Sequence, residues 1–300
     1  MKRRDFIRTS TLATTGLAFG AASRLLAQTG NIHFGYAAIT WQGQDRQAID
    51  DVAAVGFKGI QLRTSALPEF GDKPGALRDL LKSRGLTMVA FSSGNVRIDP
   101  QFEGEDIDIH LKHARFVRDV GGLYLQLTDS RPKRALVAAD YQRLGRLMTE
   151  IGKRTADIGI PVAYHNHMNN IGERPEEVDR VLDATDPRYV KVLLDIAHYQ
   201  QGGGDPVRAV RRHADRILFL HIKDVQSPLP GNTGDPMRSY RFVEIGRGQV
   251  DVRGVFAALA EVKFKGWAIV ELDAVPDKAR TPKESAMIAK QYLQQLGFTV

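Results

Sequence analysis

The 300-residue sequence contains no cysteine. This absence excludes disulfide bonds, thiolate metal sites and a cysteine nucleophile. Any bound metal must therefore use histidine and carboxylate ligands, and packing must stabilise the fold. Because 43% of the residues are hydrophobic and 26% are charged, the composition is that of an ordinary globular protein.

Beyond the N-terminus the sequence also lacks any lysine- and arginine-rich run with interleaved aromatic residues. The formal net charge is +7, but residues 1–27 carry five basic residues and one acidic residue, which leaves a net +3 for the rest. We therefore expect no nucleic-acid partner.

No apolar run is long enough to span a bilayer comfortably, which takes ~20 residues. The pair Arg3 and Arg4 precedes a Phe-Ile step and an apolar stretch at residues 12–22. This layout predicts an export signal over residues 1–27 and resembles a twin-arginine signal. We place cleavage after Ala27, with Ala22 as the alternative, and expect a periplasmic protein without stable membrane association. An amphipathic N-terminal helix or an uncleaved anchor would also fit this layout.

From residue 32 onward, short β-branched or aromatic runs alternate with longer amphipathic stretches. The predicted strands are residues 33–38, 59–63, 87–92, 123–128, 161–165, 191–196, 217–222 and 267–272. The predicted helices are residues 46–55, 75–84, 107–120, 141–158, 176–184, 206–213, 252–262 and 282–296. This rhythm predicts a single-domain α/β fold over residues 28–300, a closed (β/α)8 TIM barrel.

The structural alternative is a doubly wound open sheet, which would place a glycine-rich phosphate turn after the first strand. Residues 37–43 contain no such turn. One long connection, residues 225–250, follows the seventh strand and is rich in Pro, Gly and Ser. Long loops on this face of a barrel usually contribute to the active site.

Metal-competent side chains recur at the ends of the last four predicted strands. These residues are His165, Asp195, His221 and Glu271. The ends of these strands converge in a closed barrel, so the sequence predicts one site for a divalent cation. Two imidazoles and two carboxylates suit Mn²⁺, Zn²⁺, Co²⁺ or Fe²⁺, and the two nitrogens disfavour Mg²⁺. A lone histidine would more often be structural, but burying all four groups without an ion would be costly.

Other polar residues near these strand ends are candidates for the chemistry. Glu271, His165 and Lys223 are the predicted catalytic residues, and His167, His198 and Asp273 are the predicted substrate contacts. The remaining histidines are interpreted as surface or packing residues: His33, His110, His113 and His213. Asp251 is interpreted as the N-cap of the seventh helix.

Several motifs together resemble the xylose-isomerase-like family of sugar phosphate isomerases and epimerases, which includes the tagatose epimerases and inosose dehydratase. They are Gly-Phe-Lys-Gly-Ile-Gln-Leu at 56–62, Tyr-His-Asn-His at 164–167, Leu-Asp-Ile-Ala-His at 194–198, His-Ile-Lys-Asp at 221–224, Gly-Arg-Gly-Gln-Val-Asp at 246–251, and Glu271. The resemblance covers the chain after the signal. It implies a divalent metal held at the ends of strands five to eight, where this chain has His165, Asp195, His221 and Glu271.

The sequence departs from the epimerases at two positions. His165 stands where the epimerases have the first of two facing glutamates, and Gln61 stands where many relatives have a strand-two glutamate. A metal-bound imidazole is a poor base because its lone pair is engaged. The His-Asn-His pattern is closer to the inosose dehydratase branch.

The leading hypothesis is metal-assisted proton abstraction next to a carbonyl of a sugar or keto-sugar, with Glu271 as base and Lys223 or His198 holding hydroxyls. The first expected activity is that of an isomerase or epimerase, and the alternative is that of a dehydratase or lyase acting on keto-sugars or 3-keto-glycosides. A three-metal apurinic endonuclease and a non-catalytic exported sugar-binding barrel are two further candidate functions. The expected partner is a small-molecule sugar. The oligomeric state stays open, and a homo-oligomer is compatible with the sequence.

Overall fold

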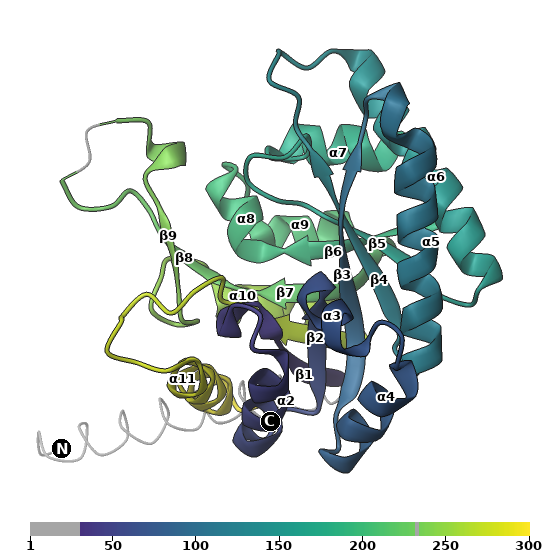
Figure 1. The fold of residues 1–300 in the computed structure, drawn as a ribbon. Coiled ribbons are helices and arrows are strands. Elements are labelled where there is room, and N and C mark those ends of the chain that lie inside the picture. The colour runs from purple at the N-terminus through teal and green to yellow at the C-terminus, as the bar shows by residue number, and fades with distance from the viewer. Residues whose placement is uncertain (1–30, 232–233) are drawn as a thin grey trace, which may run out of the picture.

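The computed structural model describes residues 31–231 and 234–300, and its parallel strands close into a barrel (Figure 1). The barrel strands, in their order around it, are β1 (Ile32–Ala37), β2 (Gly59–Arg63), β3 (Thr87–Arg97), β4 (Tyr124–Ser130), β5 (Val162–His165), β6 (Val190–Asp195), β7 (Ile217–Ile222) and β10 (Gly266–Val270), which pairs with β1. The predicted single-domain (β/α)8 fold is confirmed. The predicted export signal lies outside the described residues.

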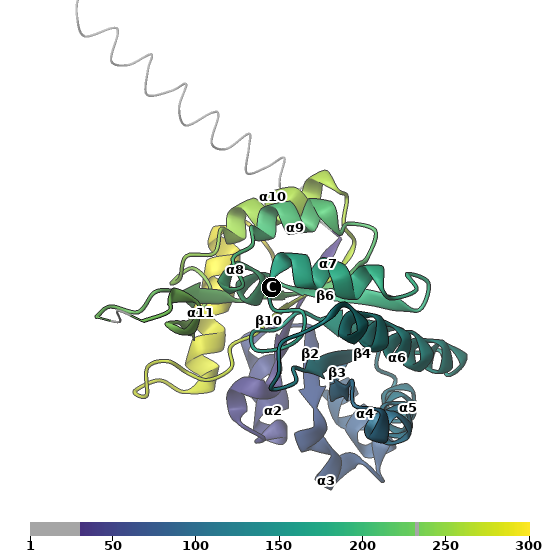
Figure 2. The ribbon, with the colours of Figure 1, turned by 90° about the horizontal axis from the view of Figure 1, so that it is seen from above.

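Helices surround the barrel and cover the outer face of the strands (Figure 2). They are α2 (Asp45–Val55), α3 (Leu67–Phe70), α4 (Pro74–Ser83), α5 (Glu103–Val120), α6 (Ala138–Asp157), α7 (Pro175–Asp183), α8 (Ile196–Gln201), α9 (Pro206–Arg212), α10 (Val252–Glu261) and α11 (Pro282–Gln295). Asp251 accepts a hydrogen bond from the Gly254 N–H at the start of α10, which confirms it as an N-cap. None of the helices in the described part of the chain is long and apolar enough to cross a membrane.

The apolar side chains of the barrel strands belong to two layers, one on each face of the sheet. The larger layer lies between the strands and the helices. A smaller layer fills the barrel interior and consists of Ala37, Val89, Ala90, Ala163, Leu193, Phe219 and Ile269. Since successive side chains on a strand alternate between faces, the residue two positions after an interior one also points inward. This alternation directs four side chains into the mouth of the barrel: the last residues of β5 and β6, the last but one of β7, and the residue that follows β10.

Several element boundaries differ from the prediction, and three of the differences bear on the site. The third strand continues to Arg97 instead of residue 92, and the sixth ends at Asp195 instead of residue 196, because the Asp195 side chain caps α8. Part of the predicted loop at 225–250 pairs as an antiparallel hairpin of β8 (Asp224–Gln226) and β9 (Arg241–Val243), which projects from the barrel in Figure 1. His110, His113 and His213 are buried, and His33 is exposed.

Candidate metal centre and active site

The four predicted metal ligands meet at the mouth of the barrel. His165, Asp195, His221 and Glu271 each offer one ligand atom, and these atoms lie within 4.8 Å of one another. All four residues are at most 6% exposed. The register of neighbouring strands explains this convergence. Asp195 of β6 lies beside His221 of β7. His165 of β5 lies beside Leu193 of β6, and the side chain of Leu193 points into the barrel, as that of Asp195 does.

The geometry of this quartet fits a divalent cation. His221 Nδ1 lies 3.4 Å from both Asp195 Oδ2 and Glu271 Oε1, and His165 Nε2 lies 3.5 Å from Asp195 Oδ2. These distances are too long for strong hydrogen bonds. His221 Nδ1 is buried and has no hydrogen-bond partner among the described residues. A buried imidazole nitrogen aimed at two carboxylates, without a partner of its own, is the donor set that a transition metal ion would satisfy.

Electrostatics keep this centre charged. Burial alone would raise the pKa values of Asp195 and Glu271. Interactions with His198 and Lys223 hold the pKa of Asp195 well below its usual range, and interactions with His221 and Lys223 do the same for Glu271. Burial lowers the pKa of His165 to about 4. Against the same burial, the carboxylates Glu271 and Asp195 raise the pKa of His221 to about 9. Without metal, a protonated His221 therefore offsets part of the negative charge, and a bound cation would take over that role.

Asp195 has a second task in the local fold. Its Oδ1 accepts hydrogen bonds from the backbone N–H groups of Ala197 and His198, both at 2.9 Å, and so caps α8. The backbone N–H of Asp195 donates to Asn166 Oδ1 at 2.9 Å, and Asn166 Nδ2 donates to the Asp195 carbonyl at 3.1 Å. These contacts fix Oδ2 as the oxygen that faces the two imidazoles.

Two glutamines lie against the outer nitrogens of the imidazoles. Gln61 accepts a hydrogen bond from His221 Nε2 at 2.9 Å, and Gln126 Nε2 lies 2.8 Å from His165 Nδ1. From the sequence, Gln61 was noted only as the residue in place of a strand-two glutamate, and Gln126 was missed. Its signal was a polar residue inside the apolar run of the fourth strand, on the same face as the interior side chains.

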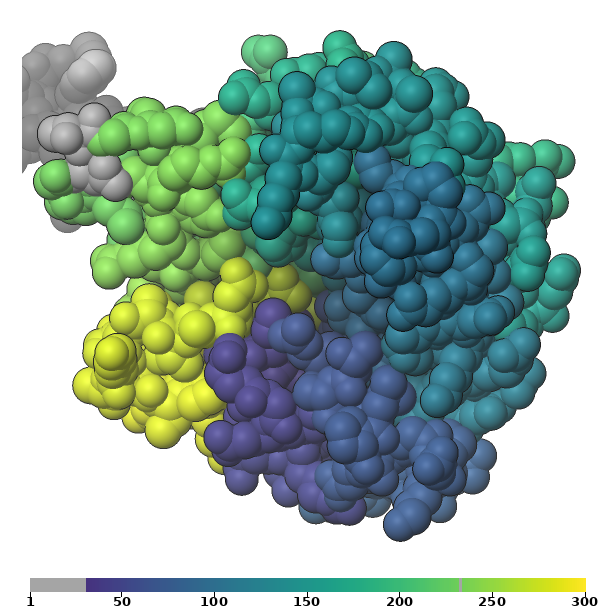
Figure 3. Space-filling view, turned by 45° about the horizontal axis from the view of Figure 1, so that its top comes forward, coloured from purple at the N-terminus to yellow at the C-terminus, as the bar shows by residue number. Residues whose placement is uncertain are grey.

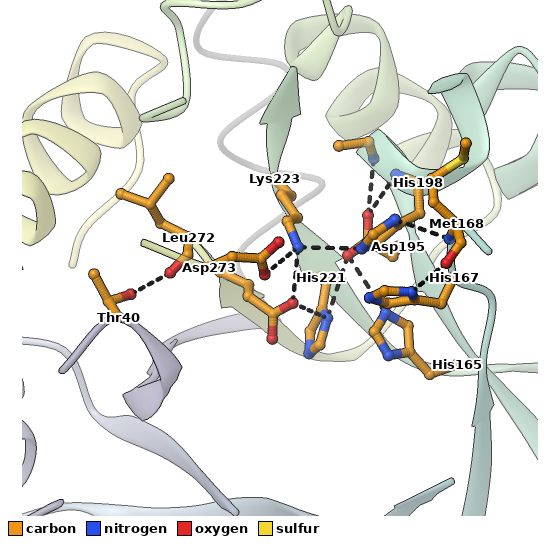
Figure 4. A network of polar contacts seen from close by, with 12 residues as sticks. Thr40, His165, His167, Met168, Asp195, His198, His221, Lys223, Leu272 and Asp273 are labelled. Carbon is orange, nitrogen blue, oxygen red and sulfur yellow. Dashed lines mark hydrogen bonds and ion pairs between the residues drawn. The ribbon is translucent and has the colours of Figure 1, made fainter. Parts of the chain in front are cut away.

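Lys223 lies behind the two acidic residues that follow β10. Its Nζ contacts Glu271 Oε1 at 3.1 Å, Asp273 Oδ1 at 2.6 Å and His198 Nε2 at 3.2 Å (Figure 4). The side chain is fully buried and its Nζ lies 4.0 Å from the centre of the Phe242 ring. Burial would lower the pKa of Lys223, but Asp273, Glu271 and Asp195 raise it. The structure therefore places Lys223 as a fixed cation that orients the two carboxylates.

The two further histidines lie against each other beside the centre, with their rings tilted by 36°. The ring centroids of His167 and His198 are 3.8 Å apart. His198 is buried, and its Nδ1 accepts from the Met168 N–H at 3.1 Å. His167 Nδ1 donates to the Met168 carbonyl at 2.7 Å, which leaves Nε2 as a hydrogen-bond acceptor.

A cavity of about 270 Å³ opens over the centre, at the hollow that Figure 3 shows between the yellow, green and blue parts of the surface. Of the predicted site residues, His165, Glu271, His167 and Asp273 line it, while Asp195, His221, His198 and Lys223 lie outside its lining. The remaining polar side chains of the lining are Gln61, Arg63, Ser92, Asn95, Gln126, Thr128 and Asn170. Hydroxyl and amide groups therefore face the metal centre across the cavity.

Comparison with known proteins agrees with this architecture. Residues 49–292 match the xylose isomerase-like TIM barrel family model. The inosose dehydratase of Lacticaseibacillus casei is 28% identical to this chain, and the match covers 87% of this chain and 96% of the relative. The inosose dehydratase of Geobacillus kaustophilus is 27% identical, and the match covers 87% of this chain and 94% of the relative. The rhizopine catabolism protein MocC of Rhizobium meliloti is 28% identical over 80% of this chain and 81% of its own.

Solved structures share the fold. The IolI protein with a bound zinc atom superposes with a TM-score of 0.73 at 18% identity, covering 88% of this chain and 97% of its own. A probable 3-DHS dehydratase, AsbF from Bacillus anthracis, has a TM-score of 0.71 at 16% identity, with coverages of 87% and 98%. The family match spans most of the barrel and includes all four residues of the metal-competent quartet. The chain therefore belongs to the xylose isomerase-like TIM barrel family and is an enzyme of that family.

Proposed function

We propose that this enzyme is a metal-dependent lyase that removes water, or another leaving group, from a keto-polyol or keto-sugar. The observation that carries this proposal is the composition of the quartet. Only one of its carboxylates, Glu271, lines the cavity, and the fifth-strand position holds His165. The similarity to inosose dehydratases over most of both chains supports the same chemistry.

His165, Asp195, His221 and Glu271 are the residues that would hold the divalent cation. When bound there, such an ion would polarise a substrate carbonyl and stabilise negative charge on its oxygen. The unpartnered His221 Nδ1 and the closeness of the four ligand atoms support this assignment.

Glu271 is the proposed base. Its Oε1 is held by Lys223, whereas Oε2 makes no hydrogen bond with the described residues. Oε2 can therefore take the proton from the carbon next to the carbonyl, while Lys223 keeps the carboxylate in place. The bond to the leaving group on the following carbon then breaks, and a departing hydroxyl takes the proton from Glu271 and leaves as water, which restores the carboxylate. A base on one side of the substrate is sufficient for this elimination.

The lining of the cavity supports a substrate without phosphate. Arg63 is the one arginine or lysine among the described residues that line it, and it is joined by neutral hydroxyl and amide side chains. A phosphate group usually requires several charge-assisted donors. A polyhydroxylated ring suits this lining better, with His167 Nε2 accepting a hydrogen bond from a hydroxyl.

Epimerisation is the second candidate, because proton removal next to a carbonyl is common to both reactions. Incubation of metal-loaded enzyme with keto-inositols and 3-keto-glycosides in D₂O, followed by NMR, separates the two. We expect loss of a substituent, and we expect Glu271→Gln to slow it by about 10³-fold, since general-base catalysis contributes roughly 10²–10⁴-fold. Deuterium at a retained C–H with every substituent in place would show that the enzyme is an epimerase.

We also propose that the enzyme is exported to the periplasm by the twin-arginine route. The paired Arg3 and Arg4 and the apolar stretch that follows them support this proposal. Replacing both arginines with lysine should retain the precursor in the cytoplasm. Recovery of this variant from the periplasm at the normal level would contradict it.

A further inference from the structure

Gln61 and Gln126 connect the two imidazoles of the quartet through a continuous chain of hydrogen bonds. His221 Nε2 lies 2.9 Å from Gln61 Oε1, Gln61 Nε2 donates to Gln126 Oε1 at 2.6 Å, and Gln126 Nε2 lies 2.8 Å from His165 Nδ1. All four residues are at most 4% exposed. We refer to the two glutamines as the amide bridge.

The amide bridge has a direction. In each carboxamide one end accepts and the other donates, and the two amides bond to each other only if an oxygen meets an NH₂ group. One end of the bridge is therefore always an oxygen, which needs an N–H from its imidazole. The other end is always an NH₂ group, which needs an imidazole lone pair. This conclusion holds whichever way round the two amides are turned.

This direction restricts which imidazole can bind a cation. A neutral imidazole carries one proton. The imidazole that donates an N–H to the bridge keeps its inner lone pair for the ion. The imidazole that accepts from the bridge has its proton on the inner nitrogen and has no lone pair to offer there. An intact bridge thus allows one of the two imidazoles, and not both, to act as a ligand.

We propose that Gln61 and Gln126 are positioning residues that give the imidazoles different roles: His221 binds the ion, and His165 stays outside the coordination sphere and presents an N–H to the substrate. This inference rests on the proposed function, because it presumes the metal centre. It reduces the protein ligands to Asp195, His221 and Glu271, and it leaves open coordination positions for substrate oxygens, as in catalytic metal sites.

Burial and contacts assign the two roles. His221 Nδ1 has no hydrogen-bond partner among the described residues and lies 3.4 Å from both carboxylates, whereas His165 Nε2 approaches only Asp195. His165 lines the cavity and His221 does not. The imidazole that can reach a substrate is therefore the one that the bridge keeps from the ion.

A single carboxylate in the bridge would remove the restriction. In Gln126→Glu, the new group can accept from Gln61 and from His165 Nδ1 at once, so both imidazoles can donate outward and bind the ion inward. Gln61→Glu achieves the same from the other position. Carboxylates that accept from a ligating histidine commonly change metal affinity by 10–100-fold, so each variant should bind Zn²⁺ about tenfold more tightly or better.

The test uses Zn²⁺ titration by calorimetry together with ¹⁵N NMR of the histidine side chains in the zinc-loaded full-length protein. We expect one metal-bound imidazole in the wild type and two in Gln126→Glu and in Gln61→Glu. Asn95→Asp is the matched control, because it adds the same charge to the wall of the cavity without joining the bridge. It should keep one metal-bound imidazole, with zinc affinity within about threefold of the wild type.

Two results would overturn the inference while leaving the proposed metal centre intact. One is a wild-type protein in which both imidazoles bind zinc. The other is a folded Gln126→Glu and a folded Gln61→Glu that each keep one metal-bound imidazole and an unchanged affinity. If the wild type binds no zinc, Mn²⁺ or Co²⁺, the metal centre of the proposed function fails, and the inference fails with it.

Discussion

Replacing Asp195 tests the metal centre because the two oxygens of this side chain do different work. Oδ1 accepts from the N–H groups of Ala197 and His198, and Oδ2 faces His165 and His221. In Asp195→Asn, the two N–H donors hold the amide oxygen in the place of Oδ1, so the NH₂ group points at the metal position. This variant keeps the cap of α8 and loses the ligand. Asp195→Ala loses both.

The loss of the helix cap and the loss of the metal ligand should change the free energy of unfolding by different amounts. Without metal, Asp195→Ala should be less stable than Asp195→Asn by about 1 kcal/mol in the free energy of unfolding, the usual worth of an N-cap. Zinc at about 100 times its Kd should stabilise the wild type by about 2.7 kcal/mol. Loss of one buried charged ligand costs about 4 kcal/mol of affinity, on the order of 10³-fold. At the same zinc concentration both variants should therefore gain only about 0.1 kcal/mol.

Urea unfolding followed by circular dichroism, with and without zinc, measures these differences, and elemental analysis counts the bound metal. His221→Ala, which leaves the cap of α8 in place, should match Asp195→Asn in losing the zinc effect. If Asp195→Asn retains the full stabilisation by zinc, or a full equivalent of metal, Asp195 is not a ligand and the assignment of the site is wrong.

Three further predictions concern catalysis and stability. His165→Glu adds a negative charge beside the metal position and should slow elimination by ~10²-fold, because it weakens the polarisation of the carbonyl; equal or faster epimerase turnover would instead favour a two-base mechanism. Burial raises the pKa of Asp129 from 3.8 to about 6, so its contribution to stability is present at low pH and is lost as the pH rises through 6. Relative to Asp129→Asn, the wild type should lose about 1.4 kcal/mol between pH 5 and pH 7.5, and parallel urea midpoints of the two proteins across this range would contradict the shift. A Cβ on Gly145 would lie 2.3 Å from the Ala184 carbonyl oxygen. Although alanine has the better helix propensity, Gly145→Ala should therefore lower the free energy of unfolding by about 1–2 kcal/mol, measured by thermal unfolding. An unchanged Tm would mean that α6 and α7 can move apart without loss of stability.

The sequence by itself determined the barrel and the four residues of the quartet. Alternation along a strand tells which side chains point inward, and this pattern can be read locally. Asp195, His221 and Glu271 each follow an apolar run of three residues, and the same is true of His165. Once the strands are known to be parallel and closed into a ring, these positions must meet.

Which predicted residues line the cavity was decided by the tertiary structure. Lys223 and His198 follow strand ends as His167 and Asp273 do, yet they lie outside the lining. The reason is that Lys223 Nζ is enclosed by Asp273, Glu271, His198 and the Phe242 ring. Phe242 comes from a hairpin within a segment that the sequence predicted as a loop, so the burial of Lys223 could not be anticipated.

The amide bridge also depends on the tertiary structure alone. Gln61 and His221 are 160 residues apart in the sequence and lie on strands that are not neighbours in the ring. A sequence pattern shows that both side chains point into the barrel, but their distance depends on strand tilt, stagger and barrel size. Local periodicity thus determined which groups face the metal, and only closure of the barrel decided which of them touch.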